Sequence, residues 1–489
     1  MSARRIWLAI IMAFIVTGCI PERYQWSPDG RWMTLLTGHG LRIADANGKL
    51  TDINIPDALV ASWFPDSKRL LVGKQTTYGT WNELSKNLTP EQVKAITDAA
   101  RRARAAAIVY QWNGPDKTDW NTFKNSFMNA EAEAGRDAEV YLDLGGAVGI
   151  YLREHDDQGQ LKKALPAERW QELQQLNQQI SCVDVYAVDA SGAKIGDRLM
   201  ANLVQSPCEM RVSPTGTAAV VVIQHAQDAR PKLDQLWVVP TDGTKPAVQI
   251  SGLAAWYPDW SPDGQYVAYA EAKAGQADDQ WLGTISRLRV VDSDGKLIDK
   301  PGGGEQLAGL IGNEFTRVRY LKDGRIIFAS VQENLPATPN DVSQRAELFS
   351  IWPGKQATVS RLLTRQAIEE IGDCAQYFEV SPDGMHVSIP DQEGKVSVVD
   401  MASGSVTEVQ PIEIPARNQQ GGPSLPSVPT WRSNDELTFV APDGSQHLRV
   451  VLWSLSNSSG KTLSNTWPPE IMQEMERQPT SSPATQSVH

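Results

Sequence analysis

The chain has 489 residues, of which 41% are hydrophobic and 21% charged, and its formal net charge is -12. This composition is ordinary for a globular protein with a large core, and the chain is too long for one small domain. The acidic balance makes a poor electrostatic match to nucleic acid or to an anionic bilayer surface, so we expect no nucleic-acid partner.

Residues 1–18 are typical of a bacterial lipoprotein signal peptide. Arg4 and Arg5 precede an apolar run, residues 6–16, that is too short for the usual membrane-spanning helix. Residues 16–19, Val-Thr-Gly-Cys, resemble the lipobox, whose cysteine becomes diacylated and N-terminal. The resemblance implies a membrane anchor at Cys19 in the bacterial cell envelope. Ile20 gives no inner-membrane retention signal, which implies the periplasmic face of the outer membrane in a cell with two membranes.

After Cys19, one turn motif recurs, and residues 26–30, Trp-Ser-Pro-Asp-Gly, are its first copy. The proline presets φ for a turn, the aspartate can bond its own backbone, and the glycine tolerates a positive φ. An apolar, β-rich run follows each copy. The copies begin at Trp26, Trp63, Val212, Trp260, Tyr320, Val380 and Trp431. Such spacing predicts a repeat architecture.

A second hairpin signal, rich in Asp, Ser and Gly, alternates with the first. Its copies lie at residues 45–48, 189–192, 240–243, 292–295, 352–354, 400–404 and 456–460. We therefore expect each repeat to form four antiparallel strands. One tight turn joins the first strand to the second, a loop joins the second to the third, and another tight turn joins the third to the fourth. The fold class we expect is all-β, a seven-bladed β-propeller, with residues 19–73 forming the first blade and the start of the second and residues 182–468 the rest.

The exception to the spacing is an insertion at residues 74–181, between the second and third strands of the second blade. Thr89 and Pro90 open a predicted helix that continues to about residue 111. Further helices are predicted at 120–134 and 166–179, whereas 139–154 fits either a helix or a hairpin. The insertion is therefore mainly α-helical, and residues 469–489 are predicted to be a disordered tail.

Long loops are predicted on only one face of the propeller, opposite the two sets of tight turns. Faces that accept insertions tend to carry function, so we expect the long loops and the helical insertion to form the partner surface. Trp256, Tyr257 and Trp281 are the aromatic candidates on this face. His39 and His447 lie near loops of the first and last repeats, which would be neighbours in a closed ring.

Three cysteines follow Cys19. An exported protein can keep disulfides, and an odd number allows at most one internal pair. The hairpin between Cys182 and Cys208 brings their neighbourhoods together, so we expect a disulfide between them, with Cys374 as the alternative partner of either one.

The Trp-Ser-Pro-Asp-Gly turn followed by an apolar strand resembles the WD40-like Pro-Asp repeat of TolB-type propellers. The resemblance covers most of residues 20–468 outside the insertion and implies an envelope propeller that binds protein partners at the mouth of a central channel. Two departures limit it. TolB-type proteins have an N-terminal α/β domain and six blades, whereas the first repeat here begins seven residues after Cys19 and the repeats number seven in all. Membership of the Tol system is therefore not implied.

The sequence gives no catalytic, metal or cofactor motif. The six histidines lack ligand spacing, and residues 459–462 lack the first glycine of a phosphate-binding loop. The motif aspartates are interpreted as turn formers and the motif tryptophans as packing between blades. We therefore expect a protein-binding or scaffold module with no cofactor. The alternative is a hydrolase or lyase acting on peptide or polysaccharide in the channel, which buried and perturbed titratable groups there would favour.

Overall fold

The computed structural model describes residues 24–113, 144–165, 167–189, 191–202, 206–223, 234–255, 257–272, 284–298, 308–312, 316–331, 346–353, 359–364, 367, 371, 377–390, 396–409, 428–442 and 448–471. Cys19 and Cys374 lie outside these ranges. By contact density the chain divides into two compact units. One comprises residues 1–72, 184–197 and 207–489, and the other comprises 73–183 and 198–206.

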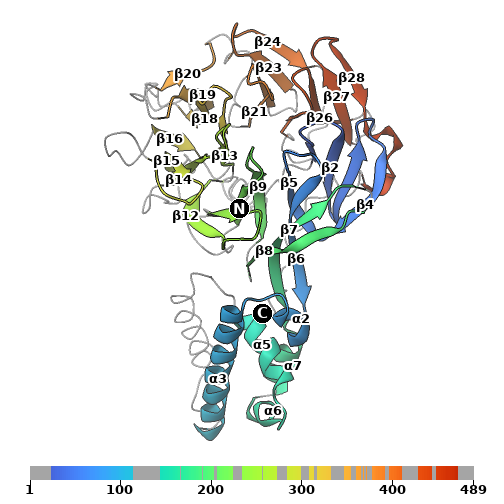
Figure 1. Ribbon diagram of the computed structural model, residues 1–489. Helices are drawn as coiled ribbons and strands as arrows, with labels where there is room; N and C mark the ends of the chain where they lie inside the picture. Colours follow the sequence, from blue (N-terminus) through green and yellow to red (C-terminus); the bar gives the residue numbers. More distant parts are fainter. Residues whose placement is uncertain are drawn as a thin grey trace, which may run out of the picture. The chain divides into compact units, whose positions relative to one another are not determined.

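The β-strands form small antiparallel sheets arranged as in a β-propeller (Figure 1). Five sheets have four strands each, in sequence order from one edge to the other. Their strands are β1 (Tyr24–Trp26), β2 (Trp32–Thr37), β3 (Gly40–Asp45) and β4 (Leu50–Pro56); β5 (Ala58–Trp63), β6 (Arg69–Tyr78), β7 (Gln178–Ala187) and β8 (Lys194–Asn202); β17 (Val318–Tyr320), β18 (Ile326–Val331), β19 (Ala346–Ile351) and β20 (Ser360–Arg361); β21 (Glu379–Val380), β22 (His386–Pro390), β23 (Val396–Asp400) and β24 (Val406–Val409); and β25 (Thr430–Trp431), β26 (Glu436–Pro442), β27 (Leu448–Ser454) and β28 (Ser459–Thr462).

The sixth sheet has eight strands. They are β9 (Pro207–Val212), β10 (Ala218–Ile223), β11 (Asp234–Pro240), β12 (Val248–Ala254), β13 (Asp259–Trp260), β14 (Tyr266–Ala272), β15 (Thr284–Asp292) and β16 (Ala308–Gly312). A single residue pair, Ala254 with Glu271, joins β12 to β14. The last strand, β16, begins later than the hairpin at 292–295 predicts: Leu297 makes only an isolated bridge to Val291.

The turn motif is stabilised by its own side chains, which hydrogen-bond to one another and to backbone N–H groups of the turn. In the copy at residues 260–264, Ser261 Oγ donates to Asp263 Oδ1 at 2.5 Å and accepts from the Tyr266 N–H at 2.9 Å. The Asp263 carboxylate also accepts from the Gln265 N–H at 3.0 Å. The copies at Ser27 and Ser381 make the same bonds. The motif aspartates are therefore turn formers, as predicted.

The motif tryptophans join neighbouring repeats. The Trp260 indole N–H donates to the Arg211 carbonyl at 2.9 Å, and the Trp63 indole donates to the Gln25 carbonyl at 3.3 Å. The Trp431 indole donates to the Glu379 carbonyl at 3.3 Å. In each case the acceptor lies on the first strand of the preceding repeat. The predicted packing between blades is confirmed. One apolar cluster lies between the sheets β1–β4 and β5–β8, and another lies between the two repeats of the eight-stranded sheet.

The first and last sheets also meet. The Trp26 indole N–H donates to Thr438 Oγ1 at 2.8 Å, and Arg432 Nε donates to the Gly30 carbonyl at 3.0 Å. A Cβ at Gly48 would lie 2.4 Å from the Leu463 carbonyl oxygen, so only glycine fits this joint. The ring is thus closed by side chains from both ends of the chain. Ile471 is buried in the same cluster, so the folded part extends into the predicted tail.

Helices dominate the second unit. They are α2 (Trp81–Ser85), α3 (Pro90–Asn113), α5 (Leu144–Glu154), α6 (Gln160–Ala164) and α7 (Ala167–Gln175). The predicted helix start at Pro90 is confirmed: the Thr89 N–H donates to Gln92 Oε1 and the Gln92 N–H to Thr89 Oγ1, the reciprocal bonds of a capping box. The ambiguous segment at 139–154 is helical from Leu144. No helix within the described ranges is both long and apolar enough to cross a bilayer.

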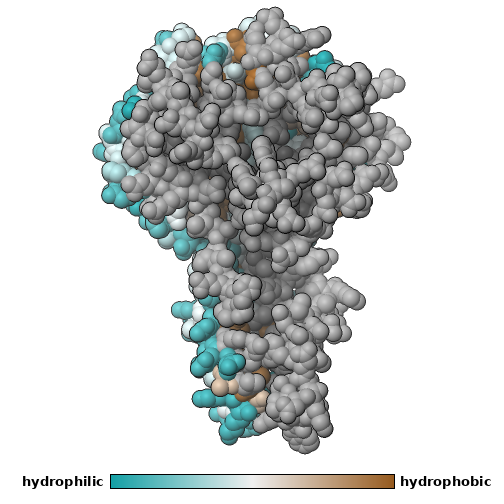
Figure 2. Space-filling view, turned by 180° about the vertical axis from the view of Figure 1, so that it is seen from behind, coloured by the Kyte–Doolittle hydropathy of each residue, from teal (hydrophilic) through white to brown (hydrophobic). Residues whose placement is uncertain are grey.

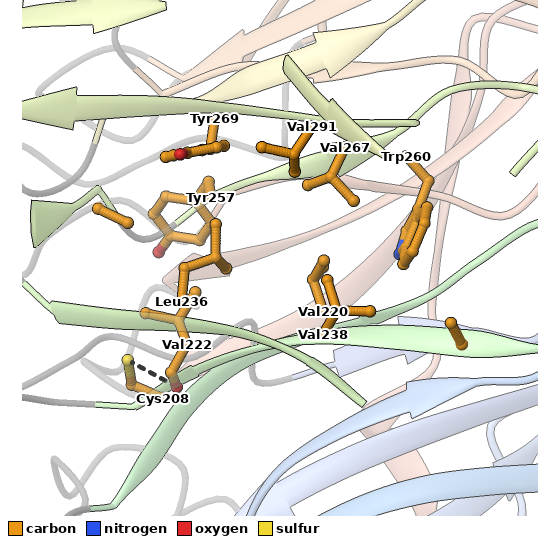
Figure 3. Packing of buried hydrophobic residues seen from close by; sticks show 12 residues of the cluster. Cys208, Val220, Val222, Leu236, Val238, Tyr257, Trp260, Val267, Tyr269 and Val291 are labelled. Atoms are coloured by element: carbon orange, nitrogen blue, oxygen red, sulfur yellow. Dashed lines mark hydrogen bonds between the residues drawn. The ribbon is translucent and has the colours of Figure 1, made fainter. Parts of the chain in front are cut away.

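The predicted disulfide is not formed. Cys182, on β7, and Cys208, on β9, are both buried as thiols. The Cys208 thiol donates to the Val222 carbonyl at 3.5 Å and packs in an apolar cluster with Val222 and Leu236 (Figure 3). Cys208 is therefore part of the apolar core of the eight-stranded sheet, the usual environment of a small buried thiol.

Candidate functional site

The residue that precedes the turn motif occupies an equivalent place in every repeat, on the first strand of its sheet. In Figure 1 the labelled first strands β5, β9, β13 and β21 lie toward the middle of the ring. The seven residues at this position are Gln25, Ser62, Arg211, Asp259, Arg319, Glu379 and Thr430. Four consecutive repeats thus contribute charges of alternating sign, and the other three contribute uncharged polar side chains.

Two arginines hold Glu379 tightly. Arg319 Nε and Nη2 donate to the two carboxylate oxygens of Glu379, each at 2.8 Å, in a bidentate pair. Arg317, two residues earlier on the chain, donates through Nη1 to Glu379 Oε2. The side chains of Arg317 and Arg319 are 0% and 2% exposed, so these ion pairs form out of contact with water.

Arg211 extends the network across the ring. Its guanidinium lies 3.5 Å from Glu379 Oε2, 3.6 Å from Asp259 Oδ1 and 3.5 Å from Glu209 Oε1. Strands β9 and β21 belong to repeats that are separated by β13 and β17, so the Arg211–Glu379 pair crosses the central axis. We call the six residues Glu209, Arg211, Asp259, Arg317, Arg319 and Glu379 the axial cluster.

The pKa values of the two central carboxyls, Asp259 and Glu379, are shifted in opposite directions. Burial raises the pKa of Asp259 above its ordinary value, even though Arg211 and Arg319 lie nearby and the Tyr320 N–H donates to its Oδ2 at 2.8 Å. Burial also acts to raise the pKa of Glu379, but Arg319, Arg211 and Arg317 together outweigh it and hold that pKa far below its ordinary value. The arginines thus favour the anionic form of Glu379, whereas burial favours the protonated form of Asp259 relative to an ordinary aspartate.

The uncharged members of the same position connect neighbouring first strands. Ser62 Oγ accepts from the Val212 N–H at 3.0 Å, and Thr430 Oγ1 donates to the Tyr24 carbonyl at 3.2 Å. The Asp259 carboxylate accepts a hydrogen bond from the backbone N–H of Tyr320, just as Ser62 Oγ accepts one from the backbone N–H of Val212. The position therefore holds the ring together throughout, and in four repeats it also carries charge.

Of the aromatic candidates, Tyr257 is described, and its predicted role is wrong. Tyr257 is 4% exposed and packs in an apolar cluster beside Tyr269 and Cys208 (Figure 3). The Arg317 guanidinium lies 4.1 Å from the centre of its ring, a cation–π contact. Tyr257 is not an exposed contact surface because its ring supports the axial cluster from the core.

The other candidates are distributed differently. His39 is exposed in the tight turn between β2 and β3. Trp256, Trp281 and His447 lie outside the described residues. Residues 459–462 form β28, paired with β27, and not a phosphate-binding loop. Within the described ranges, no group of three or more His, Cys, Asp or Glu side chains is placed to hold a metal ion.

Sequence reasoning missed the axial cluster, although a signal for it was present. The residue before each turn motif alternates as Arg, Asp, Arg and Glu through four successive repeats. In a propeller, equivalent positions on first strands converge on the axis, so this alternation predicts ion pairs between repeats.

Comparison with known proteins gives a likeness of fold. No protein-family model matches the chain, and no curated protein matches it. Similar solved structures include TolB from Acinetobacter baumannii, with 14% identity over 57% of this chain and 58% of that one and a TM-score of 0.35. The tricorn protease is 11% identical over 92% of this chain and 35% of that one, with a TM-score of 0.45.

The β-propeller domain of Cps50 (Swd1) from Myceliophteria thermophila is also similar, with 8% identity over 89% of this chain and 96% of that one and a TM-score of 0.42. The chain thus resembles TolB and other β-propeller proteins. Its matches span 58% of the TolB chain and 43% of a puromycin hydrolase. Identities and scores this low carry nothing about activity.

Proposed function

We propose that this chain is a lipid-anchored β-propeller of the bacterial envelope that binds protein partners as a scaffold or recognition module. The observation that supports it most is the axial cluster, in which the Glu379 carboxylate is already engaged by three arginines. Charges that satisfy one another across the axis make the ring rigid and leave Glu379 committed to structure. A rigid ring that displays its surface is the property a binding module needs.

We also infer that the ring has seven blades. The eight-stranded sheet contains two complete repeats, β9–β12 and β13–β16, and one ladder pair, Ala254 with Glu271, links β12 to β14. Each half has its own turn motif, at Val212 and at Trp260. With the five separate sheets, this interpretation gives one blade for each copy of the motif.

The binding function is tested by crosslinking in intact cells followed by affinity purification. The full chain is compared with a variant that lacks residues 84–180, which removes most of the helical unit. We expect specific envelope proteins to be captured by the full chain, and their loss from the deletion variant would assign recognition to the helical unit. Capture of no specific protein by the full chain would contradict the proposal.

The anchor has its own test. Cys19→Ser should abolish incorporation of labelled palmitate and move the protein from the membrane fraction to the soluble one. A Cys182→Ser variant controls for loss of a thiol as such. Lipid labelling that persists in Cys19→Ser would contradict the assignment of the anchor.

The alternative function, a hydrolase or lyase for peptide or polysaccharide, has one observation in its favour. Asp259 is a half-buried carboxyl near the axis with a raised pKa and two nearby arginines, the setting in which a general acid is found. Turnover of a peptide or oligosaccharide library that disappears in Asp259→Asn while the fold is kept would support an enzyme. No turnover by the intact protein would leave Asp259 as a structural residue.

A further inference from the structure

The exposed large apolar side chains of the described residues gather at one end of the strands. All of them lie in, or within two residues of, the connections between first and second strands or between third and fourth strands. They are Ile195, Val248, Leu297, Ile298, Trp352, Val359 and Met385, which are between 38% and 46% exposed. The described surface in view in Figure 2 is mostly hydrophilic, with a few hydrophobic patches.

The tight turns form one continuous face. In an antiparallel sheet, the first and third connections leave the same end of the strands. Turns of successive repeats also touch: the Asp29 N–H donates to Ser67 Oγ at 3.1 Å, and a Cβ at Gly264 would lie 2.9 Å from the Thr215 side chain. We call these two sets of turns together the turn face.

The densest apolar region of the turn face spans the joint inside the eight-stranded sheet. Val248 begins β12, and Leu297 and Ile298 follow the turn of the next repeat. A Cβ at Gly295 would lie 2.5 Å from Ile250 and 3.6 Å from Val248, so this turn packs directly on β12. An ion pair between Lys245 and Asp294 at 3.6 Å, both largely exposed, spans the same joint.

The turn face of the third to sixth repeats is also acidic. Its described turns at 240–247, 261–265, 292–298, 321–325, 381–385 and 400–405 carry seven carboxylates and four basic residues. The carboxylates are those of Asp242, Asp263, Asp292, Asp294, Asp323, Asp383 and Asp400, and the basic residues are Lys245, Lys296, Lys322 and Arg325. Hydrogen bonds within these turns lower the pKa of several of the aspartates, Asp242 and Asp400 among them, so the charge persists at neutral pH.

The lipid anchor would leave this face accessible. β1 begins at Tyr24 at the end of the strand opposite the turn face, and Cys19 precedes Tyr24 by five residues. Five residues reach about 17 Å at most. An anchor at Cys19 therefore keeps the long-loop end near the bilayer and the turn face away from it.

We propose that the turn face of the third to sixth repeats docks a basic, amphipathic segment of a protein partner. Exposed apolar side chains framed by acidic turns are complementary to a segment that presents apolar groups on one side and Lys or Arg on the other. The inference rests on the proposed binding function and assigns it a second surface, distinct from the helical unit. An anionic bilayer is a poor occupant because the face is acidic.

The test uses the purified full chain and two synthetic amphipathic peptides, one built of Lys and Leu and the other of Glu and Leu in the same pattern. We expect the Lys/Leu peptide to bind the chain in fluorescence anisotropy. Replacing Val248, Leu297 and Ile298 by Ser should weaken it about tenfold or more, since three apolar contacts are lost. The matched control, Ile195→Ser, removes an exposed apolar side chain outside the acidic repeats and should leave binding unchanged.

Equal binding by the triple-Ser variant, equal binding of the Glu/Leu peptide, or stronger binding to phosphatidylcholine–phosphatidylglycerol vesicles than to the Lys/Leu peptide would each overturn the inference. Its failure is distinguishable from failure of the proposed function. Partners captured in cells equally by the full chain and by the triple-Ser variant would leave the binding function standing and remove only this surface.

Discussion

At the scale of single residues, the axial cluster is costly to bury because it removes several charges from water. Arg317 and Arg319 have no exposure to water to offset their desolvation and depend on Glu379. Buried ion pairs add little net stability over well-packed apolar residues, but the loss of one partner leaves an uncompensated buried charge. A chain selected for stability alone has no need of such a cluster, so its presence points to a demand for a fixed geometry at the axis.

Glu379→Gln tests how much the ring depends on this carboxylate. We expect the free energy of unfolding to fall by about 3–5 kcal/mol, because three arginines lose their common anion. Urea denaturation followed by tryptophan fluorescence measures it. The control is Glu436→Gln, which removes a half-exposed partner of Arg432 and should cost less than about 1 kcal/mol. Equal losses in the two variants would show that Glu379 is no more important than a surface acid.

Asp259→Asn tests the raised pKa of Asp259. A carboxyl whose pKa is higher in the folded than in the unfolded state favours folding at low pH, and this contribution is lost as pH rises from about 4 through the folded pKa. The stability of the native protein relative to Asp259→Asn should therefore decrease over that window. Urea midpoints from pH 4 to 8 measure the difference. A difference that is constant with pH would contradict the raised pKa.

At the scale of elements, the turn motif works by local hydrogen bonding. Ser261 makes two bonds and Asp263 makes two, so the connection between β13 and β14 is held by its own side chains. Because every partner lies within five residues, the sequence alone predicts the motif's place and role. The glycine that completes it has a φ of +69° at Gly30, a conformation that few other residues adopt.

Ser261→Ala should lower the free energy of unfolding by about 1–3 kcal/mol, since the Tyr266 N–H loses its acceptor and Asp263 its donor. Gln265→Ala, at an exposed position in the same turn, is the control and should change it by less than about 0.5 kcal/mol. Thermal or urea unfolding compares the two. If the Ser261 variant is as stable as the control, the serine is dispensable to the turn.

Trp260→Phe tests the joint between repeats. The replacement keeps an aromatic ring but removes the indole N–H that donates to the Arg211 carbonyl, so we expect a loss of about 1 kcal/mol. In Trp237→Phe the lost bond is to Gln235 on the same strand, and the ring is half-buried, so the loss should be smaller. Hydrogen exchange should show faster opening of β9 in Trp260→Phe only. If the β9 amides are protected from hydrogen exchange as well in Trp260→Phe as in the native protein, the Trp260–Arg211 hydrogen bond does not stabilise the contact between these repeats.

The sequence predicts some features of this structure and misses others. The turns, the strand order within a repeat and the start of α3 at Pro90 were accessible because each depends on residues close in the chain. The packing role of the motif tryptophans was accessible because they recur at one position of the repeat. The Arg211–Glu379 pair was not, because its partners are 168 residues apart and meet only in the folded ring. Tyr257 and Cys208 were misjudged for the same reason: their burial depends on which sheet packs against them.

At the scale of the whole molecule, the first unit is a ring closed on itself. Trp26 bonds Thr438, and Trp467 donates its indole N–H to the Gly48 carbonyl, so residues from the two ends of the repeat region meet. The axial cluster ties four repeats together at the centre, and the turn motifs tie neighbours together at one face. These features favour rigid display of surfaces over chemistry at the axis, which is why we propose a binding module.

The most direct test of that proposal is capture of partners in intact cells by the full chain, by the variant lacking residues 84–180 and by the variant with Ser at Val248, Leu297 and Ile298. We predict that the full chain captures specific envelope proteins and that at least one of the two altered surfaces loses them. An absence of specific partners from all three, with a correctly folded and membrane-bound protein, would contradict a binding function and leave the enzymatic alternative.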